Sequence, residues 1–452
     1  MQLMMIGLRN FILDLNLNFK MISNKITNGL IGNPIIPGDK SISHRSIIIP
    51  SISIGITEIN NILKSEDVYH TLNAFKNMGV RIEENKDKVI IFGKGLTSLN
   101  EPQTEIYLGN SGTSARLLTG LLASQKFVSK LTGDKSLSSR PMRRITEPLL
   151  KMNASIETSN GNLPIIIKGN KLNNTIIDIT IPSAQIKSGL LLAALNTHGL
   201  SKIVEHNISR DHTEIMLEAF DADIGIEKID NKKIISINGK KELKSVNIDV
   251  PSDLSSSSFF IVAALVNKNS HLKMSNINVN PTRNGILLAL KKMGAKINFL
   301  NKRQINKEEI CDIEVFYSNL NGCELGPEIA KLMIDEYPIL SVAACFANSP
   351  SIFRGLSELR VKESDRLKLI TTNLERCGVN CKVEEDDLYI YPSDQYEINN
   401  NSIQTDYDHR IAMAFSVMGS KIGELNILDS DSINTSFPSF IEEFNKIGGK
   451  LS

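Results

Sequence analysis

The segment at residues 37–45 reads Pro-Gly-Asp-Lys-Ser-Ile-Ser-His-Arg and carries side chains that bind anions. Lys40 offers a compact positive charge, Ser41 a hydroxyl, and Arg45 a planar fork that matches phosphate or carboxylate. A solvated turn is the simple alternative for such a polar stretch. Because later segments have the same character, the pattern favours a site for anionic groups.

A glycine- and hydroxyl-rich segment at residues 108–116 runs into an apolar helical stretch. Its backbone N–H groups, together with Asn110, Gly112 and Arg116, would bind an anion at the positive end of that helix. An ordinary capped helix is the alternative. The Gly-Lys-Ser/Thr ending of a nucleotide-binding Walker loop is missing.

Three further segments place cations, amides or hydroxyls before an apolar run. They contain Arg140 among several basic residues, then Ser183, Ala184 and Gln185, and then Ser209 and Arg210. Serines in such places commonly cap helices, and some of the arginines are expected to be solvated.

The second half of the chain adds carboxylates beside bases. Asp335 precedes a strongly apolar run, so we expect it to be partly buried with a raised pKa; a helix-capping role is the alternative. Lys362, Glu363 and Arg366 lie in a dense charged stretch, which a solvated turn would also explain. Lys362 and Glu363 would titrate as a coupled pair. With Arg410, these segments predict a pocket for substrates that carry several phosphate or carboxylate groups.

Composition limits the classes of function. With 452 residues, 41% hydrophobic content and a net charge of +1, the chain predicts two large globular domains and neither nucleic acid nor a membrane as partner. Five cysteines without metal-like pairing predict a reducing, cytoplasmic compartment. Zinc-type spacing, a dinucleotide fingerprint and a membrane-length apolar run are missing from the sequence, so we expect no metal and no cofactor. Residues 1–20 lack the features of a signal peptide and read as an N-terminal extension, or as residues upstream of a start at Met21.

One structural unit recurs six times and must position these segments. In each copy an amphipathic helix ends at a turn and an alternating strand follows; the turns are at Gly79, Asn153, Asp221, Gly294, Gly378 and Gly448. Gly, Asn and Asp best tolerate the left-handed conformation that ends a helix, and the change of periodicity marks helix then strand. The spacing is too long for a solenoid and is typical of small α/β subdomains.

The repeats divide between two domains. Pro-Gly at 37–38 and Val-Pro-Ser-Asp at 250–253 read as paired linkers, with three of the turns between them. We therefore predict a discontinuous domain formed by residues 21–38 and 253–452, and an inserted domain formed by residues 39–252. Two crossings at one place make a hinge, and a cleft between domains is a usual ligand site.

In combination these motifs resemble the 5-enolpyruvylshikimate-3-phosphate synthase family from residue 28 to residue 452. The specific strings are Gly-Asp-Lys-Ser at 38–41, Gly-Asn-Ser-Gly-Thr at 109–113, Ser-Ala-Gln at 183–185, Arg-Val-Lys-Glu-Ser-Asp-Arg at 360–366 and Asp-His-Arg at 408–410. The resemblance implies an α/β fold of two domains, each with three βαβαββ repeats and the helices inside. It also implies a shikimate-pathway transferase that moves the enolpyruvyl group of phosphoenolpyruvate to the 5-hydroxyl of shikimate 3-phosphate and releases phosphate. We expect a monomer whose partners are these small molecules.

The same resemblance implies roles for individual residues. Shikimate 3-phosphate would contact Lys40, Ser41, Arg45, Ser183, Ala184, Gln185, Ser209, Asp335 and Lys362. Phosphoenolpyruvate would contact Lys40, Asn110, Gly112, Arg140, Gln185, Arg366 and Arg410. Asp335 would take the proton of the 5-hydroxyl, while Glu363 with Lys362 would serve proton transfer at the methylene carbon.

Within that family the chain resembles the second, glyphosate-tolerant class. The motifs of that class stand at 38–40, 183–187, 210–214 and 280–283. Many relatives of the first class carry a Lys where this chain has Thr435, but Gly112 is retained where some tolerant enzymes have Ala.

Two rival functions remain open on the sequence. A nucleotide-sugar enolpyruvyl transferase has the same fold, but its usual reactive cysteine lies in the inserted domain, and here the first cysteine is Cys311. A non-catalytic phosphate-binding protein on this scaffold is the other alternative, and the acids beside the cations count against it.

Overall fold

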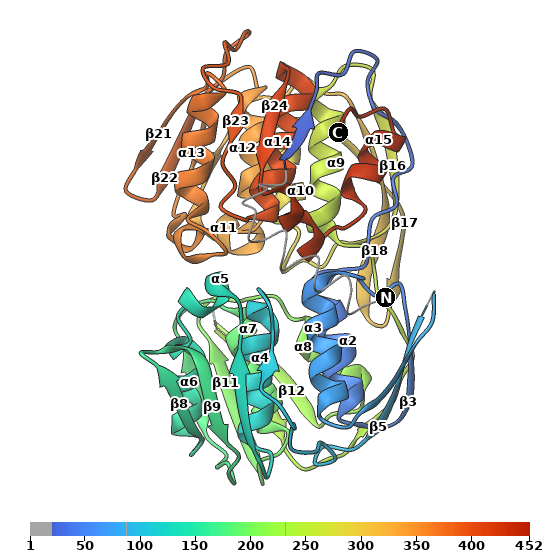
Figure 1. Cartoon of the computed structure of the whole chain (residues 1–452), viewed down its shortest axis with the longest axis vertical. Coiled ribbons are helices and arrows are strands. Elements are labelled where there is room, and N and C mark those ends of the chain that lie inside the picture. Colours follow the sequence, from blue (N-terminus) through green and yellow to red (C-terminus); the bar gives the residue numbers. More distant parts are fainter. Residues whose placement is uncertain (1–19, 87, 231) are drawn as a thin grey trace.

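The computed structural model describes residues 20–86, 88–230 and 232–452. They form two lobes stacked along the long axis and joined along one side (Figure 1). The lower lobe contains the elements from α2 to β15, and the upper lobe contains β1, β2 and the elements from α9 to α15. Apart from Lys20, the predicted N-terminal extension lies outside the described residues.

Three units of one design build the lower lobe. In each, a strand, a helix and a parallel second strand are followed by a further helix and an antiparallel hairpin. The first unit comprises α2 (Lys40–Ser51), β3 (Ser53–Asn60), α3 (Glu66–Asn77), β4 (Arg81–Glu84) and β5 (Lys88–Lys94), with β14 (Leu243–Lys244) and β15 (Ile248–Asp249) as its parallel edge. The second comprises β6 (Ile106–Tyr107), α4 (Gly112–Ala123), β7 (Val128–Thr132), α5 (Lys135–Ser139), α6 (Arg143–Lys151), β8 (Ser155–Ser159) and β9 (Asn162–Lys168). The third comprises β10 (Ile176–Ile179), α7 (Ala184–Ala194), β11 (Leu200–Glu205), α8 (His212–Ala219), β12 (Ile224–Ile229) and β13 (Lys232–Asn238).

The upper lobe repeats the design. Its first unit comprises β2 (Ile31–Gly32), α9 (Leu254–Val266), β16 (His271–Asn278), α10 (Gly285–Lys292), β17 (Lys296–Ile305) and β18 (Glu308–Phe316). The second comprises β19 (Glu324–Leu325), α11 (Pro327–Met333), α12 (Tyr337–Cys345), β20 (Ser351–Phe353), the 3-10 helix η1 (Ser357–Val361), α13 (Arg366–Arg376), β21 (Asn380–Glu384) and β22 (Asp387–Tyr391). The third comprises β23 (Ser402–Ile403), α14 (His409–Ile422), β24 (Leu425–Leu428), η2 (Ser430–Thr435) and α15 (Phe440–Lys446), and β1 (Lys20–Ser23) completes its sheet.

The six predicted turns are confirmed. Each turn residue has a positive φ, from 62° at Asp221 to 106° at Gly448, as a left-handed helix end requires. The strand predicted after Gly448 is wrong. Of that segment only Leu451 pairs with β1, through a single bridge to Ser23, and the strand that pairs along β1 is β24.

Each lobe keeps its helices inside and its sheets outside. Every residue of α9 is buried, whereas β9 and β13 alternate between buried and more exposed positions. A helix that is apolar on all sides must lie in the interior, and a strand with one apolar face covers it. Two separate hydrophobic cores result, one in each lobe. The fold is the two-domain α/β arrangement that the resemblance implied.

The chain passes between the lobes at two adjacent places. Gly38 forms a bridge with Ser252, the Asp39 N–H donates to the Pro251 carbonyl at 2.7 Å, and the Asp253 N–H donates to the Pro37 carbonyl at 2.9 Å. Gly38 is required here, because a Cβ would lie 2.0 Å from the Asn61 carbonyl oxygen. These crossings form a compact hinge on one side of the gap between the lobes.

Candidate active site

The predicted anion-binding segments lie at helix N-termini. Helices α2, α4 and α7 of the lower lobe begin at Lys40, Gly112 and Ala184, and α13 and α14 of the upper lobe begin at Arg366 and His409. The N-cap residue of each of these helices accepts a hydrogen bond from a backbone N–H, which fixes the start of the helix. Helix dipoles therefore add positive potential to that of the side chains.

Lys40 is held by a carboxylate that the sequence did not point to. Its Nζ lies 2.5 Å from Oδ2 of Asp67, which is on α3 and nearly buried. Ser41 lies beside it on the first turn of α2, and its carbonyl accepts from Nη1 of Arg45 at 2.8 Å. The ion pair leaves the lysine partly exposed, so the ammonium is positioned and still accessible.

Arg45 lies deeper in the lower lobe than its neighbours. It donates from Nε to Thr213 at 2.5 Å and from Nη2 to Ser188 at 2.7 Å, and only 3% of it is exposed. Burial, offset in part by the Asp39 and Glu214 carboxylates, lowers the pKa of Arg45 to about 10. Arg45 therefore joins α2 to α7 and α8 from below the helix N-termini.

A second cationic group surrounds the start of α4. Arg140 donates to both oxygens of Asn110, the backbone carbonyl at 3.3 Å and the side-chain amide, and Asn110 donates to Asp134 at 2.7 Å. Gly112 leaves space here, since a Cβ would lie 2.8 Å from Nη1 of Arg116 and 3.1 Å from Nη1 of Arg140. Burial, and then the charges of Arg140 and Arg144, lower the pKa of Arg116 to about 10.

The start of α7 connects with this group. Gln185 accepts from Nη1 of Arg116 at 2.7 Å and donates to Thr113 at 3.0 Å. Ser183 is the N-cap of α7, and Ala184 is its first residue. Ser209, which precedes α8, donates to Glu205 at 2.5 Å. The structure therefore brings the segments at 110–116 and 183–185 into direct contact.

Asp335 is the centre of a cluster of charged side chains, most of which belong to the upper lobe. Its carboxylate lies 2.6 Å from Nη2 of Arg210, 3.1 Å from Nη1 of Arg366 and 3.5 Å from Nζ of Lys362. Burial raises the pKa of Asp335, but the charges of Lys362, Arg210, Arg410 and Arg366 outweigh it and hold the pKa well below its usual value. The expected raised pKa is therefore wrong, because the cations come from other segments. The capping alternative also fails, since Glu336 is the N-cap of α12.

Arg366 and Glu363 complete the cluster. Arg366 is fully buried, with Nε 2.7 Å from Asp408 and Nη2 2.5 Å from Glu363. Burial raises the pKa of Glu363, but the Arg366 and Arg140 charges lower it to well below its usual value. Arg410 donates to the Asp335 carbonyl at 3.2 Å and lies 3.6 Å from Glu336. The predicted charged stretch at 358–366 is thus built into the protein, and a freely solvated turn is excluded.

Contacts between the lobes bring the two halves of the site together. Arg210 of the lower lobe meets Asp335 of the upper lobe, and Glu363 lies 3.8 Å from Nη1 of Arg140 and accepts at its carbonyl from Ser136 at 3.1 Å. Outside this region, Arg144 donates to both carboxylate oxygens of Glu358 at 3.0 and 3.2 Å. Of the predicted residues, Arg140, Asp335, Lys362, Glu363, Arg366 and Arg410 are linked by these pairs and those described above.

Sequence reasoning missed the residues that hold the cations in place. Asp67 on Lys40, Asp408 on Arg366, and Glu336 near Arg410 each come from a separate segment, and Arg283 joins Asp39 and Asp253 at the hinge. Asp408 was within a recognised motif, but its partner Arg366 is 42 positions earlier. Local spacing carries no signal for such pairs.

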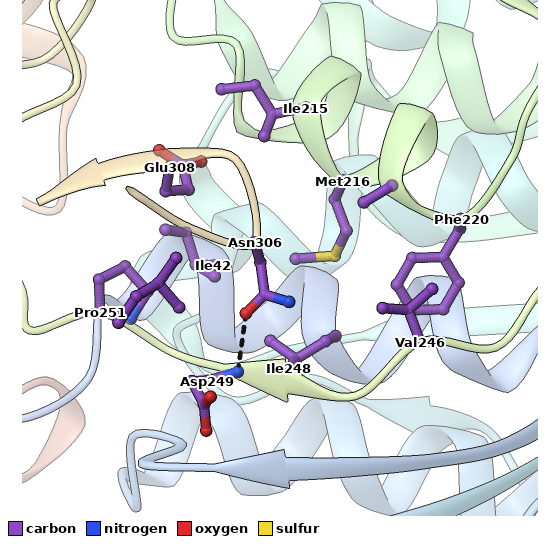
Figure 2. Close-up of a pocket in the computed structure, with 12 residues that line it drawn as sticks. Ile42, Ile215, Met216, Phe220, Val246, Ile248, Asp249, Pro251, Asn306 and Glu308 are labelled. Carbon is purple, nitrogen blue, oxygen red and sulfur yellow. Dashed lines mark hydrogen bonds between the residues drawn. The ribbon is translucent and has the colours of Figure 1, made fainter. Parts of the chain in front are cut away.

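The other features of the described residues do not suggest another centre of chemistry. No group of three or more metal-ligating side chains occurs among them, and no described helix is long and apolar enough to cross a membrane. All five cysteines are buried and unpaired. Figure 2 shows an apolar pocket that is lined in part by Pro251, where Ile42, Met216, Phe220 and Ile248 face one another. Asn306 accepts there from the Asp249 N–H. No Lys or Arg of the described ranges lines this pocket.

Comparisons with known proteins agree with this arrangement. A family model described as EPSP synthase (3-phosphoshikimate 1-carboxyvinyltransferase) matches residues 25–444. A 3-phosphoshikimate 1-carboxyvinyltransferase of Ruthia magnifica is 44% identical over 430 residues, 95% of this chain and 98% of the relative. One from Legionella pneumophila strain Philadelphia 1 is 43% identical over 421 residues, 92% and 96%.

Solved structures give the same result. The EPSP synthase of Acinetobacter baumannii has a TM-score of 0.84 and 40% identity, and the match covers 96% of this chain and 99% of that one. The enolpyruvyl transferase NikO of Streptomyces tendae has a TM-score of 0.76 with the same coverage but 15% identity, which shows a shared fold only. Charged side chains of the two lobes meet at the boundary between them. With this fold and these relatives, the chain belongs to the EPSP synthase (3-phosphoshikimate 1-carboxyvinyltransferase) family.

Proposed function

We propose that the cleft transfers the enolpyruvyl group of phosphoenolpyruvate to the 5-hydroxyl of shikimate 3-phosphate and releases phosphate. The reaction needs a cationic surface for two anions, a group that protonates the methylene carbon, and a group that accepts the hydroxyl proton. The cleft offers all three within one connected set of side chains. Family membership and the names of the relatives support the choice of substrates.

The substrates are proposed to divide the cleft between them. Shikimate 3-phosphate would lie against the lower lobe, on Lys40, Ser41, Ser183, Ala184, Gln185 and Ser209, with Arg45 beneath and with Asp335 and Lys362 above. Phosphoenolpyruvate would lie between the lobes, on Lys40, Asn110, Gly112, Arg140, Gln185, Arg366 and Arg410. The pairing of Arg140 with Asn110 and its approach to Glu363 support the second assignment, because they place a lower-lobe cation beside the upper-lobe cluster.

Asp335 is proposed to accept the proton of the 5-hydroxyl. Its depressed pKa keeps it ionised at neutral pH, as an acceptor must be. Glu363 is also ionised at neutral pH, because its pKa is lowered. We therefore propose that the Lys362 ammonium delivers the proton to the methylene carbon, and that the Glu363 carboxylate neutralises part of the charge of Arg366.

One observation carries this proposal: the Asp335 carboxylate lies within 3.5 Å of cations from both lobes. Replacing it tests the assignment. We expect Asp335→Asn to lower kcat about 100- to 10,000-fold, the usual contribution of a general base, and to bind shikimate 3-phosphate no more weakly than the parent. Phosphate release and calorimetric binding would be measured on the same preparations. Asp223→Asn, an exposed carboxylate bonded to Asn238, is the matched control and should keep full activity. Normal turnover by Asp335→Asn would refute the role.

The rival functions are separated by the acceptor. A nucleotide-sugar enolpyruvyl transferase would release phosphate with a nucleotide sugar and not with shikimate 3-phosphate. A phosphate-binding protein would bind both anions and release nothing. The absence of cysteine from the 310 residues before Cys311 favours shikimate 3-phosphate over the nucleotide sugar.

We also propose that the enzyme belongs to the glyphosate-tolerant class. The motifs at 183–187, 210–214 and 280–283, and Thr435 in place of a lysine, support this assignment. Gly112 counts against it, because some tolerant enzymes have Ala at this position. Inhibition by micromolar glyphosate, competitive with phosphoenolpyruvate, would contradict tolerance.

For the cellular context, we propose a cytoplasmic monomer without nucleic-acid partners, and domains formed by residues 21–38 with 253–452 and by residues 39–252. The five unpaired cysteines fit a reducing compartment, and the net charge of +1 gives no field for nucleic acid. One chain supplies both faces of the cleft, and its two hydrophobic cores follow the proposed division.

A further inference from the structure

Four charged side chains lie together inside the lower lobe. Nζ of Lys187 on α7 is 2.9 Å from Glu205, the last residue of β11, and 2.8 Å from Glu214 on α8. Nζ of Lys233 on β13 is 3.0 Å from Glu214. At most 4% of any of these side chains is exposed. These four buried groups are two cations and two anions, and Lys233 also lies 3.7 Å from the more exposed carboxylate of Asp211.

The cluster forms hydrogen bonds with the loop between β11 and α8. Ser209 is held at two points, since its hydroxyl donates to Oε1 of Glu205 at 2.5 Å and its carbonyl accepts from Nζ of Lys187 at 3.3 Å. This loop also carries Arg210, which crosses the cleft to Asp335. The path of the loop therefore depends on Lys187 and Glu205.

Lys187 also belongs to the helix that starts the neighbouring part of the site. Its backbone N–H donates to the Ser183 carbonyl at 3.1 Å, so it lies one turn after the segment at 183–185. A single side chain thus connects the start of α7 with Ser209. No other described side chain in the cluster donates to both the Glu205 carboxylate and the Ser209 carbonyl.

Stability alone is a poor explanation for this cluster. Taking four charges out of water costs several kcal/mol per ion, and well-packed apolar residues of similar volume often serve a fold as well or better. Burial lowers the pKa of Lys187, but the Glu214 and Glu205 carboxylates raise it above its usual value, so the lysine stays charged. A charged group kept at this cost is best explained by what it positions.

We propose that Lys187 and Glu205 are positioning residues for shikimate 3-phosphate. They fix Ser209 relative to the segment at 183–185, so that the two segments lie against the same ligand. Neither residue touches the substrate. This inference rests on the proposed function and adds to it two buried residues that position the binding site of one of the two substrates. Phosphoenolpyruvate is proposed to share only Gln185 with the supported segments, and its other ligands, such as Arg140, Arg366 and Arg410, form no ion pair with Lys187 or Glu205.

The test compares two double substitutions in the same cluster. Lys187→Met with Glu205→Gln removes one cation and one anion. It breaks both ion pairs of Lys187 and its hydrogen bond to the Ser209 carbonyl, but leaves the Glu214–Lys233 pair intact. Lys233→Met with Glu214→Gln also removes one cation and one anion. It breaks the pairs of Glu214 with Lys187 and Lys233 and the pair of Lys233 with Asp211, and it leaves both hydrogen bonds of Ser209 in place. We expect the first to raise KM for shikimate 3-phosphate about tenfold or more, with KM for phosphoenolpyruvate within about twofold. The second should leave both KM values within about threefold, whatever it does to the melting temperature.

Single substitutions decide the question if a double variant does not fold. Glu205→Asp withdraws the carboxylate from Ser209 by one methylene and keeps its charge, and Glu214→Asp is its match on the other side of Lys187. KM for shikimate 3-phosphate should rise in Glu205→Asp and stay unchanged in Glu214→Asp. Equal effects in the matched variants, or equal effects on the two substrates, would overturn the inference. Failure of the parent protein to turn over shikimate 3-phosphate would overturn the proposed function instead.

Discussion

His44 makes the stability of the lower lobe depend on pH in a predictable way. His44 is a residue of α2, and its imidazole is fully buried, with Nδ1 2.8 Å from the Thr71 hydroxyl and 3.2 Å from the Ser114 hydroxyl. Among the described residues its Nε2 has no hydrogen-bond partner. Burial, followed by the charges of Lys40 and Arg45, holds the pKa of His44 well below its usual 6.5. The folded protein therefore keeps this ring neutral.

The sign and size of the effect follow from this difference. Well above pH 6.5 the ring is neutral in both states and adds no pH dependence. Below it, the unfolded chain binds a proton that the folded lobe rejects, so stability falls as the pH decreases. Between pH 6.5 and pH 5.5 the loss is about 1 kcal/mol, or about 2–4 °C in the melting temperature of a lobe of this size. The carboxylates Asp335 and Glu363 contribute only at lower pH, because their ordinary pKa values are near 4.

Thermal unfolding at pH 7.5, 6.5 and 5.5 measures the effect. His44→Gln keeps a polar group against Thr71 and Ser114 but cannot titrate, so its melting temperature should fall less between pH 6.5 and pH 5.5 than that of the parent. His198→Gln changes an exposed histidine and should leave the pH dependence as it is. If His44→Gln and the parent lost the same number of degrees, His44 would be protonated in the fold and the reasoning would be refuted.

Two further substitutions address the cleft. Gly112→Ala places a Cβ 2.8 Å from Nη1 of Arg116 and 3.1 Å from Nη1 of Arg140, so both guanidinium groups must move. Weakening one charged hydrogen bond should raise KM for phosphoenolpyruvate about tenfold in steady-state kinetics and change KM for shikimate 3-phosphate less. An unchanged KM for phosphoenolpyruvate would contradict the assignment of Arg140. Glu358→Gln removes a partly exposed pair between the lobes worth about 0.5–1 kcal/mol, so both KM values should rise two- to fivefold. X-ray scattering without substrates should show a larger particle, and unchanged dimensions would mean that this pair does not favour closure.

The repeat architecture was predictable because each unit ends at a residue that tolerates positive φ. Gly79, Asn153 and Asp221 mark the three lower units, and all have φ between 62° and 82°. The anion-binding segments were predictable for a similar reason, since each joins cations or hydroxyls to an apolar helix. Both signals are local in sequence.

The partners of those residues could not be predicted, because they are distant in the chain. Arg144 and Glu358 are separated by 214 positions, and Arg210 and Asp335 by 125. The error on Asp335 has the same origin. The sequence showed the apolar run that buries the carboxylate, which raises a pKa, but not the four cations that lower it. The direction of a pKa shift in a folded protein is set by three-dimensional neighbours.

The depressed pKa of Asp335 makes it a weak proton acceptor in the free protein. An acid paired with Arg210, Arg366 and Lys362 is ionised but holds a proton poorly. Arg366 is one of the groups proposed to hold phosphoenolpyruvate, and Lys362 one of those for shikimate 3-phosphate. When anionic substrates bind to these cations, they compete with Asp335 for the same charges. If the substrates bind as proposed, they would raise the pKa of Asp335 toward its ordinary value as the hydroxyl arrives and so make the carboxylate a better base.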